Sequence, residues 1–218
     1  MLYYENKARK KGFRTIIGVD EAGRGPLAGP VVAAAVSLKD KNFNSRIDDS
    51  KVITHRQRQE AFHEIFDKAY VGVGIISETV IDTVNILEAT YLAMARAVDR
   101  LIDQLPTSEI ADNAQETFLK RTCLLIDGPS FKTHLPFHYQ TIVNGDALSL
   151  SIACASIVAK VTRDRILETY DRVFPQYGFR NHKGYPTRAH KLAIQQHGLS
   201  LIHRQTFESF VLRAKVLL

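Results

Sequence analysis

Two adjacent carboxylates, Asp20 and Glu21, stand at the end of a short apolar run and directly before a glycine-rich turn. The run, residues 15–19, has the length and composition of a buried strand, and Gly23 and Gly25 let the backbone after it bend and approach a ligand closely. Successive strand residues point to opposite faces of a sheet. We therefore expect the chain to leave strand geometry here if both carboxylates hold one ion.

Two further acids occupy the same kind of position later in the chain. Asp127 follows the apolar segment 124–126, and Asp146 follows the predicted strand 138–143. If these strands are neighbours in one sheet, the four carboxylates converge and raise one another's pKa. Such hard oxygen ligands suit Mg²⁺ or Mn²⁺ rather than zinc, and two ions about 4 Å apart can activate water and stabilise the leaving oxygen of a phosphodiester. A single Asp at a strand end is more often a turn former or helix cap, so the prediction depends on the set of four.

Other chemistries find no support in the sequence. Gly23, Gly25 and Gly29 are spaced one residue too widely for the dinucleotide-binding fingerprint, and a strand is predicted to follow them where that motif needs a helix. There is no HExxH, GxSxG or P-loop motif, and the eight histidines show no metal-ligand spacing. Cys123 and Cys154 lie in apolar runs, which indicates buried thiols of a reducing compartment.

Six blocks of this sequence together resemble ribonuclease HII, a family of type 2 ribonucleases H. They are residues 18–26, 48–51, 126–128, 145–146, 155–164 and 182–187, and they occur in the family's order. The resemblance covers roughly Gly18 to Phe207. The sister type, ribonuclease HIII, typically has Gly-Lys-Gly where this chain has Gly23-Arg24-Gly25, which favours type HII.

The resemblance implies a fold, a reaction and a set of acids. The fold is α/β and ribonuclease H-like, a five-stranded mixed sheet flanked by helices, with a helical C-terminal extension. The reaction is hydrolysis 5′ to a ribonucleotide in an RNA/DNA hybrid or in duplex DNA with embedded ribonucleotides, giving a 3′-OH and a 5′-phosphate, for ribonucleotide excision repair and RNA primer removal. The catalytic and metal-binding residues would be Asp20, Glu21, Asp127 and Asp146, with two Mn²⁺ or Mg²⁺ ions.

The resemblance also implies how the substrate is recognised. The backbone of Gly23, Arg24 and Gly25 would sense the 2′-OH that distinguishes RNA from DNA. Tyr185 would stack on the sugar of the following deoxynucleotide, although an ordinary surface tyrosine is the alternative. The candidates for phosphate contacts are Ser50, Lys51, Asn85, Lys183 and Arg188. For each of them, a side chain that is exposed to solvent and binds nothing is the alternative.

The charge distribution is consistent with an anionic partner. The net charge is +6, and residues 160–218 hold 11 Lys and Arg against 4 Asp and Glu. Nucleic acid is the usual partner of such a surface, and a solvated helical face is the alternative. No window approaches the roughly 20 apolar residues of a membrane span, so we expect a soluble cytoplasmic protein, acting as a monomer. Recruitment by a clamp or polymerase stays open, and in residues 205–210 we expect packing of two Phe rather than a clamp-binding peptide.

The elements that must position these residues follow from the hydrophobic pattern. Strands are predicted at 15–19, 31–36, 71–76, 124–126 and 138–143, and helices at 54–69, 85–104, 147–170, 188–197 and within 201–218. Residues 1–14 are expected to form a basic, flexible or partly helical lead-in, residues 15–174 the catalytic domain, and residues 175–218 a basic helical extension packed on it. Arg163, Asp164 and Arg165 are expected to form an ion-pair cluster, and the insertion 106–116 carries no catalytic signal.

Two rival functions remain at this stage. One is a different two-metal nuclease of the same fold, such as a resolvase-like or transposase-like enzyme, which would cut branched DNA lacking ribonucleotides. The other is a catalytically idle nucleic-acid-binding module, against which the presence of all four acids argues.

Overall fold

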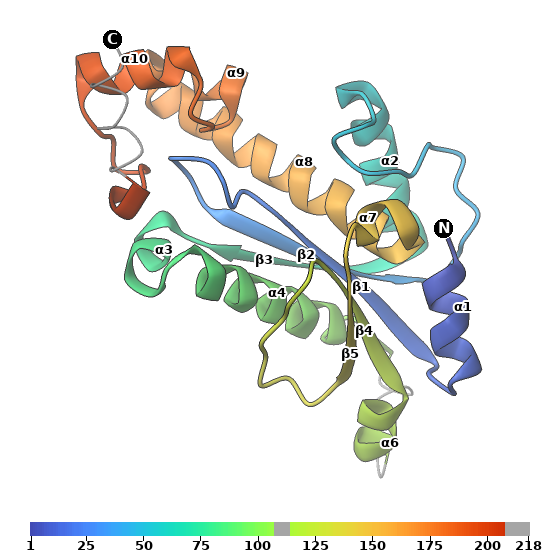
Figure 1. Ribbon diagram of the computed structural model, residues 1–218. Coiled ribbons are helices and arrows are strands. Elements are labelled where there is room, and N and C mark those ends of the chain that lie inside the picture. The colour runs from blue at the N-terminus through green and yellow to red at the C-terminus, as the bar shows by residue number, and fades with distance from the viewer. Residues whose placement is uncertain (107–113, 208–218) are drawn as a thin grey trace.

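A five-stranded mixed sheet forms the centre of the computed structural model, which describes residues 1–106 and 114–207 (Figure 1). Its strands are β1 (Thr15–Ala22), β2 (Val31–Leu38), β3 (Ala69–Ile76), β4 (Thr122–Asp127) and β5 (His138–Ile142), in the spatial order β3-β2-β1-β4-β5. β2 is antiparallel to both β1 and β3, whereas β1, β4 and β5 run parallel. The carboxyl ends of β1, β4 and β5 therefore lie at one edge of the sheet.

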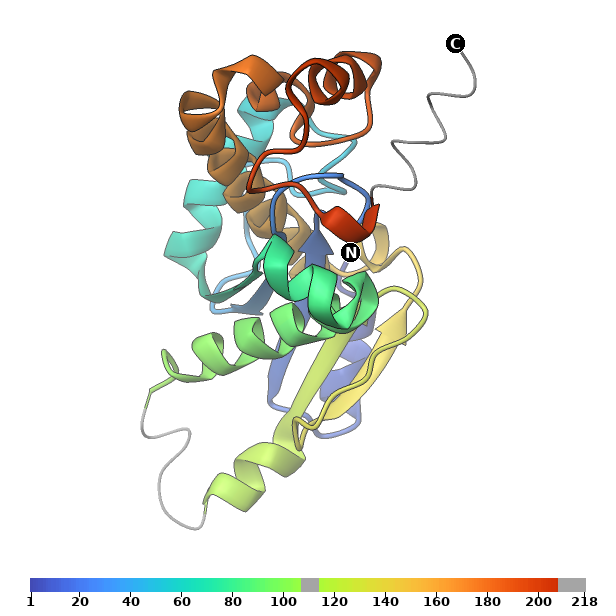
Figure 2. The same ribbon diagram turned by 90° about the vertical axis from the view of Figure 1, so that its left-hand side faces the viewer.

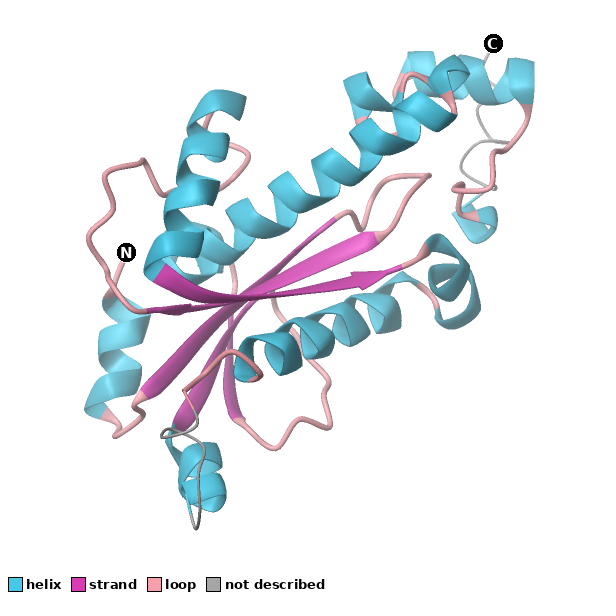
Figure 3. Cartoon of the chain, turned by 180° about the vertical axis from the view of Figure 1, so that it is seen from behind, coloured by secondary structure: helices cyan, strands magenta, loops and turns pink. Residues whose placement is uncertain are grey.

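Helices cover both faces of the sheet. α8 (Leu150–Val173) lies on one face and α4 (Ile86–Ile102) on the other (Figure 3). The remaining helices are α1 (Tyr3–Lys10), α2 (His55–Lys68), α3 (Glu78–Val84), α6 (Ala114–Arg121), α7 (Gly145–Leu148), α9 (Phe179–His182) and α10 (Arg188–His197), with 3₁₀ turns η1 (Pro175–Tyr177) and η2 (Gln205–Phe207). α9 and α10 gather beyond the far end of α8 (Figure 2). The predicted α/β ribonuclease H-like fold is confirmed.

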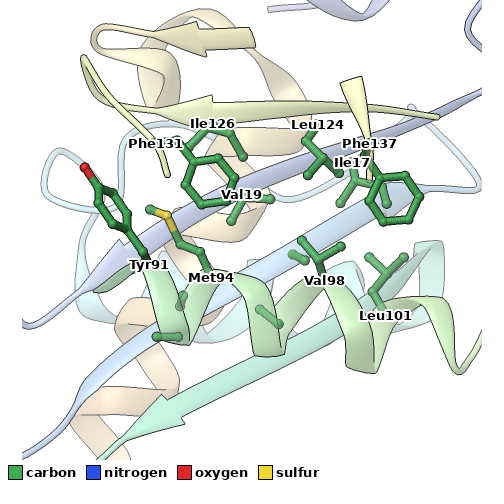
Figure 4. Close-up of a cluster of buried hydrophobic side chains, with 14 of the residues drawn as sticks. Ile17, Val19, Tyr91, Met94, Val98, Leu101, Leu124, Ile126, Phe131 and Phe137 are labelled. Carbon is green, nitrogen blue, oxygen red and sulfur yellow. The ribbon is translucent and has the colours of Figure 1, made fainter. Parts of the chain in front are cut away.

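The core lies between the sheet and these two long helices. Figure 4 shows Met94, Val98 and Leu101 of α4 against the strand residues Ile17, Val19 and Leu124. On the other face, a Cβ added to Gly18 would lie 2.3 Å from the carbonyl carbon of Ser151. α8 thus begins directly on β1, and the central strand is buried on both sides.

Two predicted helices differ from the structure at their boundaries because polar residues start or stop helices. The helix predicted over 85–104 starts at Ile86, since Asn85 has φ 71° and its side chain accepts from the N–H groups of Leu87 and Glu88. α3, which precedes it, was not predicted. The helix predicted over 147–170 is interrupted at Ser149, which is extended and caps α8.

The two ends of the chain also refine the predictions. Residues 3–10 of the lead-in form α1, whose buried Glu5 accepts from the N–H and hydroxyl of Ser151. In the predicted terminal helix, residues 201–204 form a turn and η2 follows. Residues 208–218 and 107–113 lie outside the described residues, and with them Phe210 and most of the insertion.

The predicted ion-pair cluster at Arg163, Asp164 and Arg165 is wrong. Asp164 pairs one turn back with Lys160 at 2.7 Å, and Arg165 donates to the side chain of Gln59. Arg163 is buried and donates to backbone carbonyls, because its position on α8 points it under the loop after β1.

Both cysteines are buried and free, as predicted. Within the two described ranges, the chain contains no helix of the length and apolarity that crossing a membrane requires.

Candidate active site

The strand ends bring the predicted acids to one edge of the sheet. Val19 of β1 pairs with Ile126 of β4, so the next residues, Asp20 and Asp127, are neighbours on adjacent strands. Asp146 follows β5 in the first turn of α7. A cavity of about 470 Å³ at this edge is lined by Asp20, Glu21, Ala22, Gly23, Arg24, Gly25, Ser50, Lys51, Arg58, Asp127, Ser156, Lys160 and Tyr185.

Asp20 is the most buried of the acids that line the cavity, at 4% exposure. Its carboxylate accepts from the N–H of Glu21 at 2.7 Å and from the side chain of Ser156 on α8. Burial, and then the negative charges of Glu21 and Asp127, raise the pKa of Asp20 well above its usual value. Burial raises the pKa of Glu21 and Asp127 as well.

The expected departure from strand geometry at Asp20 and Glu21 is wrong. β1 continues to Ala22, and Asp20 and Glu21 pair in register with Ala34 and Ala33 of β2. Asp20 therefore points to the α8 face and Glu21 to the opposite face. The Glu21 carboxylate lies 3.4 Å from the Arg24 guanidinium.

The other two acids are held by different partners. Asp127 Oδ1 accepts from the N–H of Gly145 at 2.7 Å, where the chain turns through Asn144 in the left-handed conformation. Asp146 is buried, and its Oδ2 lies 3.3 Å from Lys51 Nζ. Lys51, predicted to contact phosphate, offsets the charge of one of the acids in this structure.

The residues present fit a divalent cation, although they do not form a finished cage. In the described part of the chain, no three acidic, histidine or cysteine side chains are grouped closely enough to hold one ion. The donors are hard carboxylate oxygens, and three of them belong to acids whose pKa burial has raised. A cation bound between the two strand ends would relieve their repulsion, and Mg²⁺ and Mn²⁺ prefer such oxygens.

The loop after β1 and Tyr185 form the opposite wall of the cavity. Gly23 has φ +101°, and a Cβ there would lie 2.1 Å from Arg163 Nε, so this position needs glycine. A Cβ on Gly25 would lie 3.7 Å from Cε1 of Tyr185, which places the ring across a narrow gap from the loop. Tyr185 is 42% exposed and lies over the Arg163 guanidinium.

The predicted phosphate contacts divide into two groups. Ser50 and Lys51 line the cavity, and the buried Ser50 hydroxyl lies 3.0 Å from that of Ser156. Asn85, Lys183 and Arg188 are not among the lining residues. Asn85 caps α4, Lys183 pairs with Glu168 at 3.1 Å, and Arg188 is exposed at the start of α10.

Sequence reasoning missed several residues that shape the site. Ser156 and Lys160 lie one turn apart on α8, a spacing visible in the sequence, but neither was predicted as a site residue although both fall in the block 155–164. Arg58 donates to the carbonyls of Ser50 and Ile53. Arg204 lies far along the chain, and nothing local in the sequence marks it.

Comparison with known proteins places this arrangement in one family. The ribonuclease HII family model matches residues 17–210. The ribonuclease HII of Syntrophus aciditrophicus (strain SB) is 47% identical over 209 residues, which cover 95% of this chain and 91% of that protein. The ribonuclease HII of Geobacter sulfurreducens is 47% identical over 205 residues, which cover 94% of this chain and 87% of that protein.

Solved structures share the same fold. The ribonuclease H2 of Pyrococcus horikoshii OT3 superposes with a TM-score of 0.66 at 25% identity, covering 92% of this chain and 96% of that one. The PCNA:RNase HII complex from Archaeoglobus fulgidus gives 0.60 at 21% identity, covering 88% and 94%. Bst-RNase HIII in complex with Mn²⁺ gives 0.62 at 15% identity, covering 95% and 72%.

Proposed function

The chain belongs to the ribonuclease HII family, endonucleases that cleave RNA in RNA/DNA hybrids and ribonucleotides embedded in DNA, and from this premise we propose which of its residues do so. Asp20, Glu21, Asp127 and Asp146 form the catalytic group. The observation that carries the proposal is that Asp20, Glu21 and Asp127, from the ends of β1 and β4, line one cavity. Asp146 of α7 is not a lining residue but contacts Lys51, which lines the same cavity.

The same acids are the ligands of the divalent ions. Metal dependence belongs to the family, and a structural relative has been solved with Mn²⁺. We propose two Mn²⁺ or Mg²⁺ ions in the catalytic complex, which when bound supply activation of the attacking water and charge stabilisation at the leaving oxygen. In this structure, Arg24 forms an ion pair with Glu21 and Lys51 with Asp146. Both ion pairs would loosen if these carboxylates bound a cation.

The loop Gly23-Arg24-Gly25 and Tyr185 select the phosphodiester. The glycine backbone approaches the ribose closely enough to sense its 2′-OH, and the Tyr185 ring lies across the gap to stack on the following deoxyribose. Cleavage then falls 5′ to the ribonucleotide and leaves a 3′-OH and a 5′-phosphate. This selectivity suits ribonucleotide excision repair and primer removal by a cytoplasmic monomer. Since an archaeal relative has been solved with PCNA, a sliding clamp is the first protein partner to test.

The test is a cleavage assay with and without divalent metal. Duplexes of one sequence carry no ribonucleotide, one, or at least four. We expect metal-dependent cutting 5′ to the ribonucleotide and none of the all-deoxy duplex, and Asp127→Asn should lower kcat about 100-fold or more. Equal cutting of the all-deoxy duplex would exclude the 2′-OH sensor. Cleavage only of branched DNA would favour the resolvase-like rival.

The stacking role of Tyr185 has its own test. Tyr185→Ala should slow cutting at a single ribonucleotide about 10-fold, whereas Tyr185→Phe, which keeps the ring, should retain most of the rate. A Tyr185→Ala rate equal to that of the unmodified protein at a single ribonucleotide would rule the stacking out.

A further inference from the structure

Arg204 is a buried arginine whose hydrogen bonds go to the substrate loop. It is 1% exposed, and its Nη2 donates to Gly23 O at 2.6 Å while Nη1 donates to Arg24 O at 3.0 Å. The same guanidinium donates to Pro26 O and twice to Gly29 O. One side chain, 180 residues away in sequence, thus holds four carbonyls of the loop that follows β1.

These contacts orient the peptide groups that face the cavity. In a trans peptide the C=O and the following N–H point in opposite directions. Because the guanidinium binds the carbonyls of Gly23 and Arg24, the N–H groups of Arg24 and Gly25 point away from it. Among the described residues, neither N–H donates to a protein acceptor. Both remain available to an oxygen of a ligand in the cavity that Arg24 and Gly25 line.

The preceding residue, His203, holds the backbone at Tyr185 through a chain of neutral imidazoles. His203 Nδ1 accepts from the N–H of Ser200 at 2.9 Å, so its proton is on Nε2. That Nε2 donates to His190 Nε2 at 3.0 Å. His190 Nδ1 then donates to Tyr185 O at 2.9 Å. Each bond in the chain fixes the tautomer of the next ring.

Backbone hydrogen bonds on either side of His203 and Arg204 connect these two residues to both walls of the cavity. The N–H of Arg204 donates to Leu27 O and the N–H of Gly29 to Ile202 O, each at 2.8 Å. Directly after Arg204, the Asp82 carboxylate accepts from the N–H groups of Gln205 and Thr206. His203 and Arg204 are therefore fixed relative to the loop that carries Gly25 and to the turn that carries Tyr185.

We propose that His203-Arg204 is a positioning unit for substrate selection, in which Arg204 aims the peptide groups that read the ribose and His203 sets the position of Tyr185. The inference rests on the sensing and stacking roles proposed above. Neither residue lines the cavity. They act through the groups they hold, and their loss should reduce selection more than duplex binding.

The test for Arg204 separates substrate selection from folding and from phosphate binding. Arg204→Lys keeps a charge but loses the planar set of donors. We measure kcat/KM on a duplex with one ribonucleotide, the inhibition constant of the all-deoxy duplex of the same sequence, and Tm, working below the Tm of every variant. The control is Leu101→Ala, which removes buried contacts of α4 in a core cluster that contains no residue of the loop 23–29.

Arg204→Lys should lower kcat/KM about 10- to 100-fold, the scale of losing an aligned donor, while the all-deoxy inhibition constant stays within about twofold. Leu101→Ala should lower Tm and leave both constants near those of the unmodified protein. An unchanged kcat/KM in Arg204→Lys overturns the proposal, and so does a parallel loss of affinity for the all-deoxy duplex. If the unmodified protein itself cuts the all-deoxy duplex, the sensing role fails independently of Arg204.

The two residues should leave different signatures. His203→Leu should lower the rate at a single ribonucleotide more than the rate in a run of four or more, the pattern expected for Tyr185→Ala. A proportional loss on both substrates would show that His203 contributes only to folding.

Discussion

Asp20 lies buried beside Glu21 and Asp127, and its pKa is raised by burial and by their charges. A group in this position weakens the metal-free fold, because the ionised carboxylate is poorly solvated and repelled. The same features favour capture of a cation. At the scale of the residue, the buried carboxylate of Asp20 therefore lowers the stability of the metal-free protein and favours the cation binding that catalysis needs.

Asp20→Asn should separate the two effects. Without metal, the variant should be about 1–2 kcal/mol more stable than the unmodified protein at neutral pH, because the buried charge is removed and the amide still bonds to Ser156. Its cleavage activity should be lost. Urea unfolding in a chelator, with Asp67→Asn as a surface control, measures the difference. A less stable Asp20→Asn protein would contradict this account.

At the scale of the element, the loop after β1 is a short segment fixed by hydrogen bonds on its side away from the cavity. Arg163 and Arg204 donate to its carbonyls. Tyr185, in the connection between α9 and α10, and His190 of α10 lie on the far side. Its two functional glycines differ in their surroundings. Gly23 is required by backbone conformation and by Arg163, whereas a Cβ on Gly25 would lie at ordinary contact distance, 3.7 Å, from Cε1 of Tyr185.

Alanine at the two glycines should therefore have opposite consequences. Gly25→Ala should change the free energy of unfolding by less than about 1 kcal/mol yet lower kcat/KM at least 10-fold, since the methyl group stands where the sugar must approach. Gly23→Ala should cost about 1–3 kcal/mol of stability because of its φ and the contact with Arg163. Unfolding curves and cleavage rates on the same preparations check both. Full activity in Gly25→Ala would contradict the close approach.

The imidazole chain predicts a pH dependence of stability. Burial lowers the pKa of His190 and of His203 to about 4. Between about pH 6.5 and 4 the unfolded chain binds protons that the folded chain does not, so stability falls as the pH falls through this window and is fully present above it. At pH 5 the loss should be on the order of 2 kcal/mol per histidine relative to pH 7.

Urea unfolding at pH 7 and 5 measures this loss. His203→Gln should reduce the pH dependence, whereas His63→Asn, at an exposed position of α2, should leave it unchanged. Equal pH dependence in His203→Gln would show that other groups titrate in this window.

At the scale of the whole molecule, the sheet has two opposite edges at the ends of its strands, and they differ in the residues that they carry. The acids, the glycine loop and Tyr185 lie at the edge where β1, β4 and β5 end, whereas β2 ends at the opposite edge, near Lys39 and Lys41. The C-terminal segment crosses back over the loop after β1 through the pairing of Ala28 with His203. Arg188, exposed at the start of α10, follows Tyr185 by three residues in the chain.

The salt dependence of duplex binding should differ between basic residues at the substrate edge and basic residues at the opposite edge. Arg188→Gln should weaken binding of an all-deoxy duplex and reduce the slope of log K against log salt by about 1, the value for one phosphate contact. Lys41→Gln, an equal charge change at the opposite edge, should leave the slope unchanged. Identical slopes in both variants would remove Arg188 from the list of phosphate contacts.

The sequence alone determined the five strands, the flanking helices and the four acids. These are local features, since an apolar run of strand length followed by an acid and a turn is visible in a window of ten residues, as at Asp127. Through the resemblance to ribonuclease HII, the sequence also predicted substrate contacts for the backbone of Gly23, Arg24 and Gly25 and for Tyr185.

Only the tertiary structure decided how these groups are held. It kept Asp20 and Glu21 in one strand because β2 continues to pair with them, and it placed Lys51 beside Asp146. It also buried the guanidinium groups of Arg163 and Arg204, which act as hydrogen-bond donors and not as surface charges. Their partners in the loop after β1 are backbone carbonyls, which carry no side-chain signature. These carbonyls lie more than 130 residues away in the chain, so no local pattern could have revealed them.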